Sequence, residues 1–162
     1  MKAIVCVDKN WGIGSGGDLL FHIPADLHFF KEKTIGNVVV MGQATFFSLP
    51  GQQPLPDRVN VVLAADPDWS AEGVIAVHSM EELFELLERY DSRLVFVCGG
   101  ASIYEQLLPY CDTAYVTKVD AERPADKHFP NLDAHPDWVL AREKEEQEYK
   151  GLRFRFTTYK MV

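Results

Sequence analysis

The clearest indication of the fold lies in LVFVCGGASIYEQLL, residues 94–108. It begins with a continuous apolar run, residues 94–98, which is typical of a strand covered on both faces. Two glycines follow, and residues 102–108 then have the spacing of an amphipathic helix. Where no side chain intervenes, backbone N–H groups and the positive end of a helix can approach a phosphate. The stretch therefore predicts a strand, a phosphate-binding glycine turn and a helix.

Further runs rich in Val and Ile predict strands at residues 3–7, 37–41, 59–64, 74–77 and 114–119. Most are continuous, as in a parallel sheet flanked by helices. Residues 152–157 instead alternate apolar with polar, so we expect this strand to pair antiparallel with residues 138–142. The expected fold class is α/β: a single domain, residues 1–162, with a central mixed, mostly parallel, eight-stranded sheet flanked by helices and ending in an antiparallel hairpin.

Composition and charge restrict the classes of partner. The chain has 162 residues, 47% of them hydrophobic, and a formal net charge of −8, which disfavours nucleic acid and anionic membranes. Three cysteines, two of them inside apolar runs, suit reduced thiols and a cytoplasmic location. We expect no signal peptide, no membrane span and no metal site, because no segment has the length or ligand spacing that these require.

Asp26 is an acid on the inward face of a predicted helix. Pro24 suits the first position of that helix, and Asp26 falls on the same face as an apolar stripe formed by Ile23, Leu27, Phe30 and Thr34. A carboxylate there needs a partner, because burying an unpaired charge is costly. The alternative is that Asp26 only complements the helix macrodipole in the first turn.

Two further glycine clusters precede predicted helices. GIGSGG, residues 12–17, has the spacing of a dinucleotide fingerprint, but Pro24 would interrupt the helix which that motif requires. We therefore interpret it as a flexible loop that, with Leu19, Leu20 and Phe21, is suited to act as an apolar lid, or else as a plain surface connection. Residues 42–45 form a second candidate phosphate turn. A capping box at Ser79 and Glu82 predicts the start of another helix.

Several short motifs, taken together and in order, resemble the dihydrofolate reductase family over nearly the whole chain. They are GIG at 12–14, IPADL at 23–27 with Phe30, VMG at 40–42 with Thr45, PLP at 54–56 with Arg58, GG at 99–100 with IYEQ at 103–106, YVT at 115–117, and Asp126 with HFP at 128–130.

The resemblance implies a substrate site for dihydrofolate. Asp26 would pair with the 2-amino group and N3 of the pteridine ring, with support from Thr117. Arg58 would take the α-carboxylate of the substrate's tail. The remaining substrate residues would be Ile4, Cys6, Leu27, Phe30, Leu49, Cys98 and Tyr104.

It also implies NADPH as cofactor and hydride transfer to C6 of dihydrofolate with protonation of N5. The catalytic set would be Asp26, acting electrostatically while water delivers the proton, together with Leu19, Phe21 and Tyr104. The cofactor set would be Cys6, Ile13, Gly14, Asp18, Leu19, Gly42, Gln43, Ala44, Thr45, Leu63, Ala64, Ala65, His78, Cys98, Gly99, Gly100, Ala101, Ser102, Ile103, Tyr104 and Gln106.

Two departures from the family pattern affect these expectations. Leu20 and Phe21 stand where the family usually has Pro-Trp, so an indole contact to water near the pterin is absent or rerouted. Gln43, Ala64 and Ala65 replace an arginine and hydroxyl residues near the adenosine 2′-phosphate. We therefore expect a weakened preference for NADPH and possible use of NADH, with His78 supplying part of the compensation.

Two other functions stay open at this point: a pyrimidine reductase of flavin biosynthesis and a non-catalytic nucleotide-binding relative. The favoured interpretation is a monomeric enzyme of one-carbon metabolism that forms tetrahydrofolate and is a target of antifolates. Neither Cys111 nor the acidic run at residues 143–148 receives a function, and that run is expected to be a solvated hairpin tip.

Overall fold

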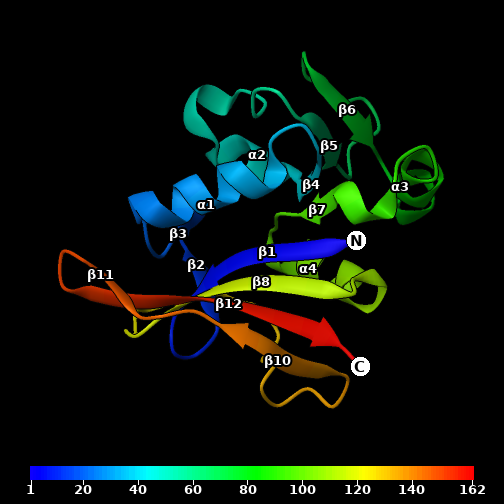
Figure 1. Ribbon diagram of the computed structural model, residues 1–162. Coiled ribbons are helices and arrows are strands. Elements are labelled where there is room, and N and C mark those ends of the chain that lie inside the picture. The colour runs from blue at the N-terminus through cyan, green and yellow to red at the C-terminus, as the bar shows by residue number, and fades with distance from the viewer.

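A mixed sheet crosses the whole molecule in the computed structural model, which describes residues 1–162 (Figure 1). Eight strands follow the order β10-β12-β8-β1-β7-β4-β5-β6, and a ninth, β11, pairs with β12. Their bounds are β1 Lys2–Val7, β4 Val38–Gly42, β5 Val59–Leu63, β6 Val74–Val77, β7 Val95–Val97, β8 Thr113–Val119, β10 Trp138–Glu143, β11 Gln147–Tyr149 and β12 Leu152–Met161. The predicted fold class is confirmed.

Parallel pairing joins β8, β1, β7, β4, β5 and β6, whereas β12 runs antiparallel to both β8 and β10. The alternating residues 152–157 form the start of β12, as predicted. The acidic run predicted as a hairpin tip lies, exposed, where β10 turns into β11. Figure 1 shows β6 and β10 at opposite edges of the sheet.

Helices cover both faces of the sheet. They are α1 Pro24–Thr34, α2 Gln43–Ser48, α3 Met80–Leu87 and α4 Ala101–Leu107, with 3₁₀ turns η1 Pro50–Gln52, η2 Ser92–Leu94 and η3 Leu108–Tyr110. Since side chains alternate along a strand, Val38 and Val40 face α3 and α4, while Val39 and Met41 face α2. The helix α1 lies on the same side as α2. Burial on both faces explains the continuous apolar strands.

The predicted helix starts are confirmed. Pro24 occupies the first turn of α1, and the backbone N–H of Glu82 donates to Ser79 Oγ at 3.1 Å at the start of α3. The Glu82 carboxylate accepts from the backbone of His78 instead of Ser79. None of the helices combines the length and the apolar character that a membrane-spanning helix needs.

A second, three-stranded sheet forms where a flexible loop was predicted. The strands β2 Gly12–Ser15 and β3 Asp18–Leu19 make a hairpin, and β2 also pairs with β9 Lys127–His128. The predicted loop therefore contains two short strands that the sequence analysis did not expect, because a partner strand from far along the chain satisfies the backbone of β2. No helix begins at these glycines, since β3 follows them directly. This agrees with our conclusion that they do not form a dinucleotide fingerprint.

Candidate active site

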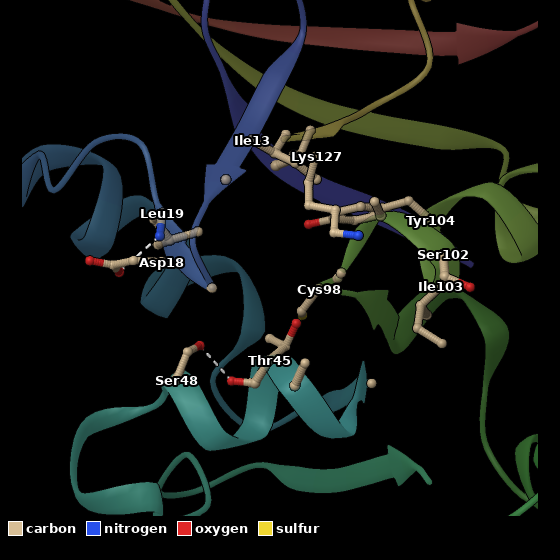
Figure 2. A pocket seen from close by; sticks show the side chains of 18 of the residues that line it. Ile13, Asp18, Leu19, Thr45, Ser48, Cys98, Ser102, Ile103, Tyr104 and Lys127 are labelled. Atoms are coloured by element: carbon tan, nitrogen blue, oxygen red, sulfur yellow. Dashed lines mark hydrogen bonds between the residues drawn. The ribbon is translucent and has the colours of Figure 1, made fainter. Parts of the chain in front are cut away.

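A cavity of about 400 Å³ opens beside the carboxyl ends of β1, β7 and β4, three neighbouring parallel strands (Figure 2). Ligands of open α/β sheets bind at such ends. The residues that line it are Val5, Cys6, Ile13, Gly14, Ser15, Gly17, Asp18, Leu19, Gly42, Gln43, Ala44, Thr45, Ser48, Cys98, Gly99, Gly100, Ala101, Ser102, Ile103, Tyr104 and Lys127.

Glycines form one wall of this cavity, where an added Cβ would be tightly packed. A Cβ built on Gly99, whose φ is +115°, would lie 3.3 Å from the Tyr104 ring. One built on Gly42 would lie 3.2 Å from Ile103 Cγ1. The backbone N–H of Gly42 donates to the Gly99 carbonyl at 2.8 Å and so joins the turns that follow β4 and β7. The wall is a backbone cradle held by both turns.

Sixteen of the twenty-one residues predicted for the cofactor line this cavity. The other five lie outside it. Leu63, Ala64 and Ala65 lie at and after the end of β5, where His78 Nδ1 is 3.0 Å from the Ala64 carbonyl oxygen. Gln106 instead donates to Ser102 Oγ at 2.9 Å. Apart from Gln106, the predicted cofactor residues therefore form two groups. One group lines the cavity around the glycine cradle, and the other lies at the end of β5.

Asp26 is held by a threonine from the sheet and is a neighbour of the cavity-lining residue Cys6. Thr117, a buried residue of β8, donates to Asp26 Oδ1 over 2.6 Å. The cavity-lining residue Cys6 is adjacent to Thr117 in the register of β1 and β8. No lysine, arginine or histidine forms an ion pair with Asp26. This half-buried acid therefore has hydrogen-bond partners but lacks a cationic one.

The surroundings of Asp26 shift several pKa values. Burial raises the pKa of Asp26, and hydrogen bonds from Thr117 and Cys6 oppose that rise. Burial, and then the charge of Asp26, raises the pKa of the Cys6 thiol. Burial also raises the pKa of Cys98 to about 12. Both thiols are thus neutral at pH 7, and Asp26 is the acid whose charge is costly here.

Tyr104 presents its ring, and not its hydroxyl, to the cavity. The hydroxyl donates to the Ile4 carbonyl over 2.7 Å, and the buried ring packs edge-on against Phe129 at 4.9 Å. Burial raises the pKa of this phenol well above its ordinary value. The arrangement supports a packing and positioning function for Tyr104 more directly than proton transfer.

The three apolar residues predicted as a lid separate into two groups. Leu19 lines the cavity and is 54% exposed. Leu20 and Phe21 are buried in a cluster with Ile23 and Phe154. Arg123 covers the Phe21 ring, with the guanidinium carbon 4.4 Å from the ring centroid. The expectation that Phe21 closes over a reacting ring is therefore corrected, because its ring is packed in this cluster, whereas Leu19 stays exposed at the cavity.

Two residues predicted for the substrate, Leu27 and Phe30, lie on α1 after Asp26. Leu27 is 51% exposed and Phe30 partly buried, so the prediction that this stripe faces the core is wrong for its middle. Only its ends, Ile23 and Thr34, are buried. Leu49 packs against the cluster under α2.

Arg58 lies at the far end of α1. Its Nη1 donates to Thr34 Oγ1 at 3.1 Å and its Nε donates to the Pro56 carbonyl at 2.9 Å. No carboxylate forms an ion pair with it. Asp26 and Arg58 thus mark the two ends of one helix, with Leu27 and Phe30 between them.

Five cavity residues were absent from the predicted catalytic, substrate and cofactor sets, although two of them, Ser15 and Gly17, belong to the predicted lid loop: Val5, Ser15, Gly17, Ser48 and Lys127. Ser48 lies one helical turn after Thr45 and donates to its carbonyl at 2.6 Å, so helical spacing was a usable signal. Lys127 had no such signal, because only the pairing of β9 with β2 brings it to the cavity.

The comparisons with known proteins agree with this geometry. The family model described as dihydrofolate reductase matches residues 1–161. The chain is 37% identical to the dihydrofolate reductase of Bacillus subtilis (strain 168) over 142 residues, which is 88% of this chain and 82% of that protein. It is 41% identical to dihydrofolate reductase type 3 of Salmonella typhimurium over 131 residues, 81% of this chain and 78% of that protein.

A solved structure is similar as well. Dihydrofolate reductase from Enterococcus faecalis, in complex with NADP(H) and RAB-propyl, superposes with a TM-score of 0.88 at 36% identity. The match covers 99% of this chain and 95% of that one.

Proposed function

The chain belongs to the dihydrofolate reductase family, and from this premise we infer that it reduces dihydrofolate with NADPH at the cleft between α1 and the glycine cradle. The observation that carries the proposal is the acid Asp26, half-buried without a cation and held by Thr117 beside the cavity-lining residue Cys6. A flat ring with an amidine-like edge is the partner that such a carboxylate lacks.

The residues around the cradle fit a dinucleotide. Gly42 and Gly99 have no side chain and line the cavity, so a ligand's phosphates can approach bare backbone there. When bound, NADPH supplies the hydride for C6 of dihydrofolate. We assign Ile13, Gly14 and Leu19 to the nicotinamide and Thr45 with the turn at Gly99–Gly100 to the diphosphate. Leu63, Ala64, Ala65 and His78 are assigned to the adenosine end.

Asp26 acts on the substrate through its charge. Its ionised form would accept from the 2-amino group and N3 of the pteridine, and so favour a protonated ring at N5. We propose that water delivers this proton, since the Tyr104 hydroxyl is already bonded to Ile4. Thr117 is a positioning residue that fixes the Asp26 oxygen and lowers its pKa.

Leu19 and Arg58 complete the proposed cleft. The half-exposed side chain of Leu19 on β3 is suited to cover the reacting rings and to exclude water. Arg58 has donors left after its bonds to Thr34 and Pro56, and a planar guanidinium suits the carboxylate of the substrate's tail. Leu27 and Phe30 would line the slot between the two charged ends.

The proposal is tested by mixing the purified protein with NADPH and dihydrofolate and following absorbance at 340 nm. Loss of absorbance that requires both compounds is the expected result. Binding of NADPH without oxidation would instead indicate a non-catalytic relative. Oxidation only with a ribosylaminopyrimidine would indicate the reductase of flavin biosynthesis. We favour neither alternative, because we assign Arg58 to a carboxylate tail.

We also propose that the enzyme works as a monomer in the cytoplasm, contributes to tetrahydrofolate formation in one-carbon metabolism and binds antifolates in the same cleft. Sedimentation of the protein with and without NADPH tests the monomer, because a second copy would double the mass. Competition of an antifolate with dihydrofolate tests the shared cleft.

A further inference from the structure

One cation faces the cavity. Among the residues that line it, only Asp18 and Lys127 carry a charge. Figure 2 shows the Lys127 side chain extending into the cavity from the neighbourhood of Ile13. Lys127 belongs to β9 and pairs with Gly14 of β2, so the small sheet fixes its backbone over the cavity.

The ammonium group of Lys127 has no partner within the protein. No carboxylate lies within 4.0 Å of it, whereas Lys9, Lys118 and their acids form ion pairs. The other charged residue, Asp18, already accepts from the backbone N–H of Leu19 at 2.8 Å and lies 3.4 Å from His22. Lys127, which is solvent-exposed, therefore brings an unpaired positive charge to the cavity of a protein whose net charge is −8.

An ammonium group directed into a cavity favours an anionic ligand there. The neutral donors nearby are partly used, since Ser48 donates to the Thr45 carbonyl and Ser102 accepts from Gln106. Lys127 is then the one side chain of the lining that can offer a full positive charge to a phosphate.

We propose that Lys127 binds the diphosphate of the nicotinamide cofactor. The assignment rests on the proposed function, which brings a dinucleotide to this cavity. The 2′-phosphate is the other anionic group of NADPH, but the residues assigned to the adenosine end, Leu63–Ala65 and His78, lie outside the cavity that Lys127 lines. Lys127 is accordingly a cofactor-binding residue shared by NADPH and NADH.

The test is nucleotide binding, measured by calorimetric titration without dihydrofolate. The Lys127→Met variant should bind NADPH and NADH about tenfold more weakly than the wild type, since it loses a charge-assisted hydrogen bond of ordinary strength. Added salt should weaken binding less in this variant than in the wild type. Lys127→Arg, which keeps the charge, should bind both nucleotides more tightly than Lys127→Met.

Two controls make the result specific. Lys144→Met removes an exposed lysine from the turn between β10 and β11, which does not line the cavity, and should leave both dissociation constants unchanged. ADP-ribose, which has the diphosphate but no nicotinamide, should lose affinity for Lys127→Met to the same extent as NADH. Thermal unfolding of each variant checks that it is folded.

Three outcomes would overturn the assignment. Wild-type dissociation constants in Lys127→Met, in an enzyme that still oxidises NADPH with dihydrofolate, would refute the function of Lys127 and leave the proposed function intact. Loss of affinity for NADPH but not for NADH would mean that Lys127 contacts the 2′-phosphate and not the diphosphate. Failure of the wild-type protein to bind either nucleotide would refute both proposals together.

Discussion

Asp26 carries an unfavourable charge that the protein stabilises only in part. Burial raises its pKa, and the Thr117 hydroxyl, 2.6 Å away, offsets some of that rise. A carboxylate kept ionised in this way has a strong interaction to offer to a complementary ring. Burial and the Thr117 hydrogen bond act in opposite directions on the pKa of Asp26. Mutations that change either one should therefore shift this pKa.

Thr117→Val removes the hydrogen bond and keeps the shape of the side chain. Because that bond lowers the pKa of Asp26, the lower apparent pKa in the profile of kcat/KM against pH should move upward. Activity at pH 7 should fall about tenfold, the value of one charge-assisted hydrogen bond.

The matched control is Thr157→Val. The Thr157 hydroxyl is also buried in the sheet, but it donates to the Val116 carbonyl at 2.6 Å and not to an acid. This variant should lose about 1 kcal/mol of stability and keep the wild-type pH profile. Equal shifts in both variants would mean that Thr117 has only a structural function.

Asp26→Asn should make the ligand-free protein more stable at pH 7. The folded protein holds the Asp26 proton more tightly than the unfolded chain, whose pKa is near 3.8. The free energy of unfolding therefore falls as pH rises from that value through the raised pKa, and asparagine removes this loss. Urea unfolding at several pH values should show an advantage of the variant that shrinks toward pH 4. A variant that is less stable than wild type at pH 7 would contradict the assigned pKa direction.

At the residue scale, sequence analysis identified Asp26 because an acid interrupts an apolar helical stripe. The Thr117 bond was expected only from the family resemblance, since the two residues are 91 positions apart. The exposure of Leu27 was not predicted. Helical spacing defines a face but does not say whether that face meets a core or a cleft.

At the scale of elements, the turn that joins β7 to α4 brings backbone into the cavity. Gly99→Ala should cost stability because the residue has φ +115° and its Cβ would lie 3.3 Å from Tyr104. Gly151→Ala is the control: its φ is +82°, and nothing lies within 4 Å of its Cβ. Each should lose roughly 1 kcal/mol or more from backbone strain, and only Gly99→Ala should also raise the dissociation constant for NADPH.

These effects can be separated by urea unfolding and calorimetric titration of both variants. An unchanged NADPH affinity in Gly99→Ala, at a stability equal to that of Gly151→Ala, would argue against a phosphate site at the cradle.

The strands were predictable because two covered faces require continuous apolar residues, and β6 has the predicted bounds of 74–77. The hairpin of β2 and β3 was not, since its glycine-rich sequence carries no apolar alternation. The contacts that order the hairpin come from residues far along the chain. The Gly16 N–H donates to Asp126 Oδ2, 110 residues away, and β9 supplies the third strand. Contacts of that separation leave no local pattern in the sequence.

At the scale of the whole molecule, the distribution of charge should limit cofactor selectivity. The protein has a net charge of −8, and the end of β5 offers Ala64 and Ala65 where a 2′-phosphate would need donors. His78 is the nearby basic side chain, and its Nδ1 lies 3.0 Å from the Ala64 carbonyl oxygen. We therefore expect kcat/KM to favour NADPH over NADH by less than about 10³-fold, or 4 kcal/mol. Parallel steady-state assays with the two cofactors decide this, and a larger advantage would refute the weakened preference.

The central claim is that the charge of Asp26 drives reduction of dihydrofolate. Its most direct test compares steady-state turnover of dihydrofolate and NADPH at pH 7 in the wild type, Asp26→Asn and the exposed control Asp68→Asn. We predict a loss of about 10²-fold for Asp26→Asn, the usual order for a group of this kind, with Asp68→Asn unchanged. Wild-type turnover in Asp26→Asn would contradict the claim.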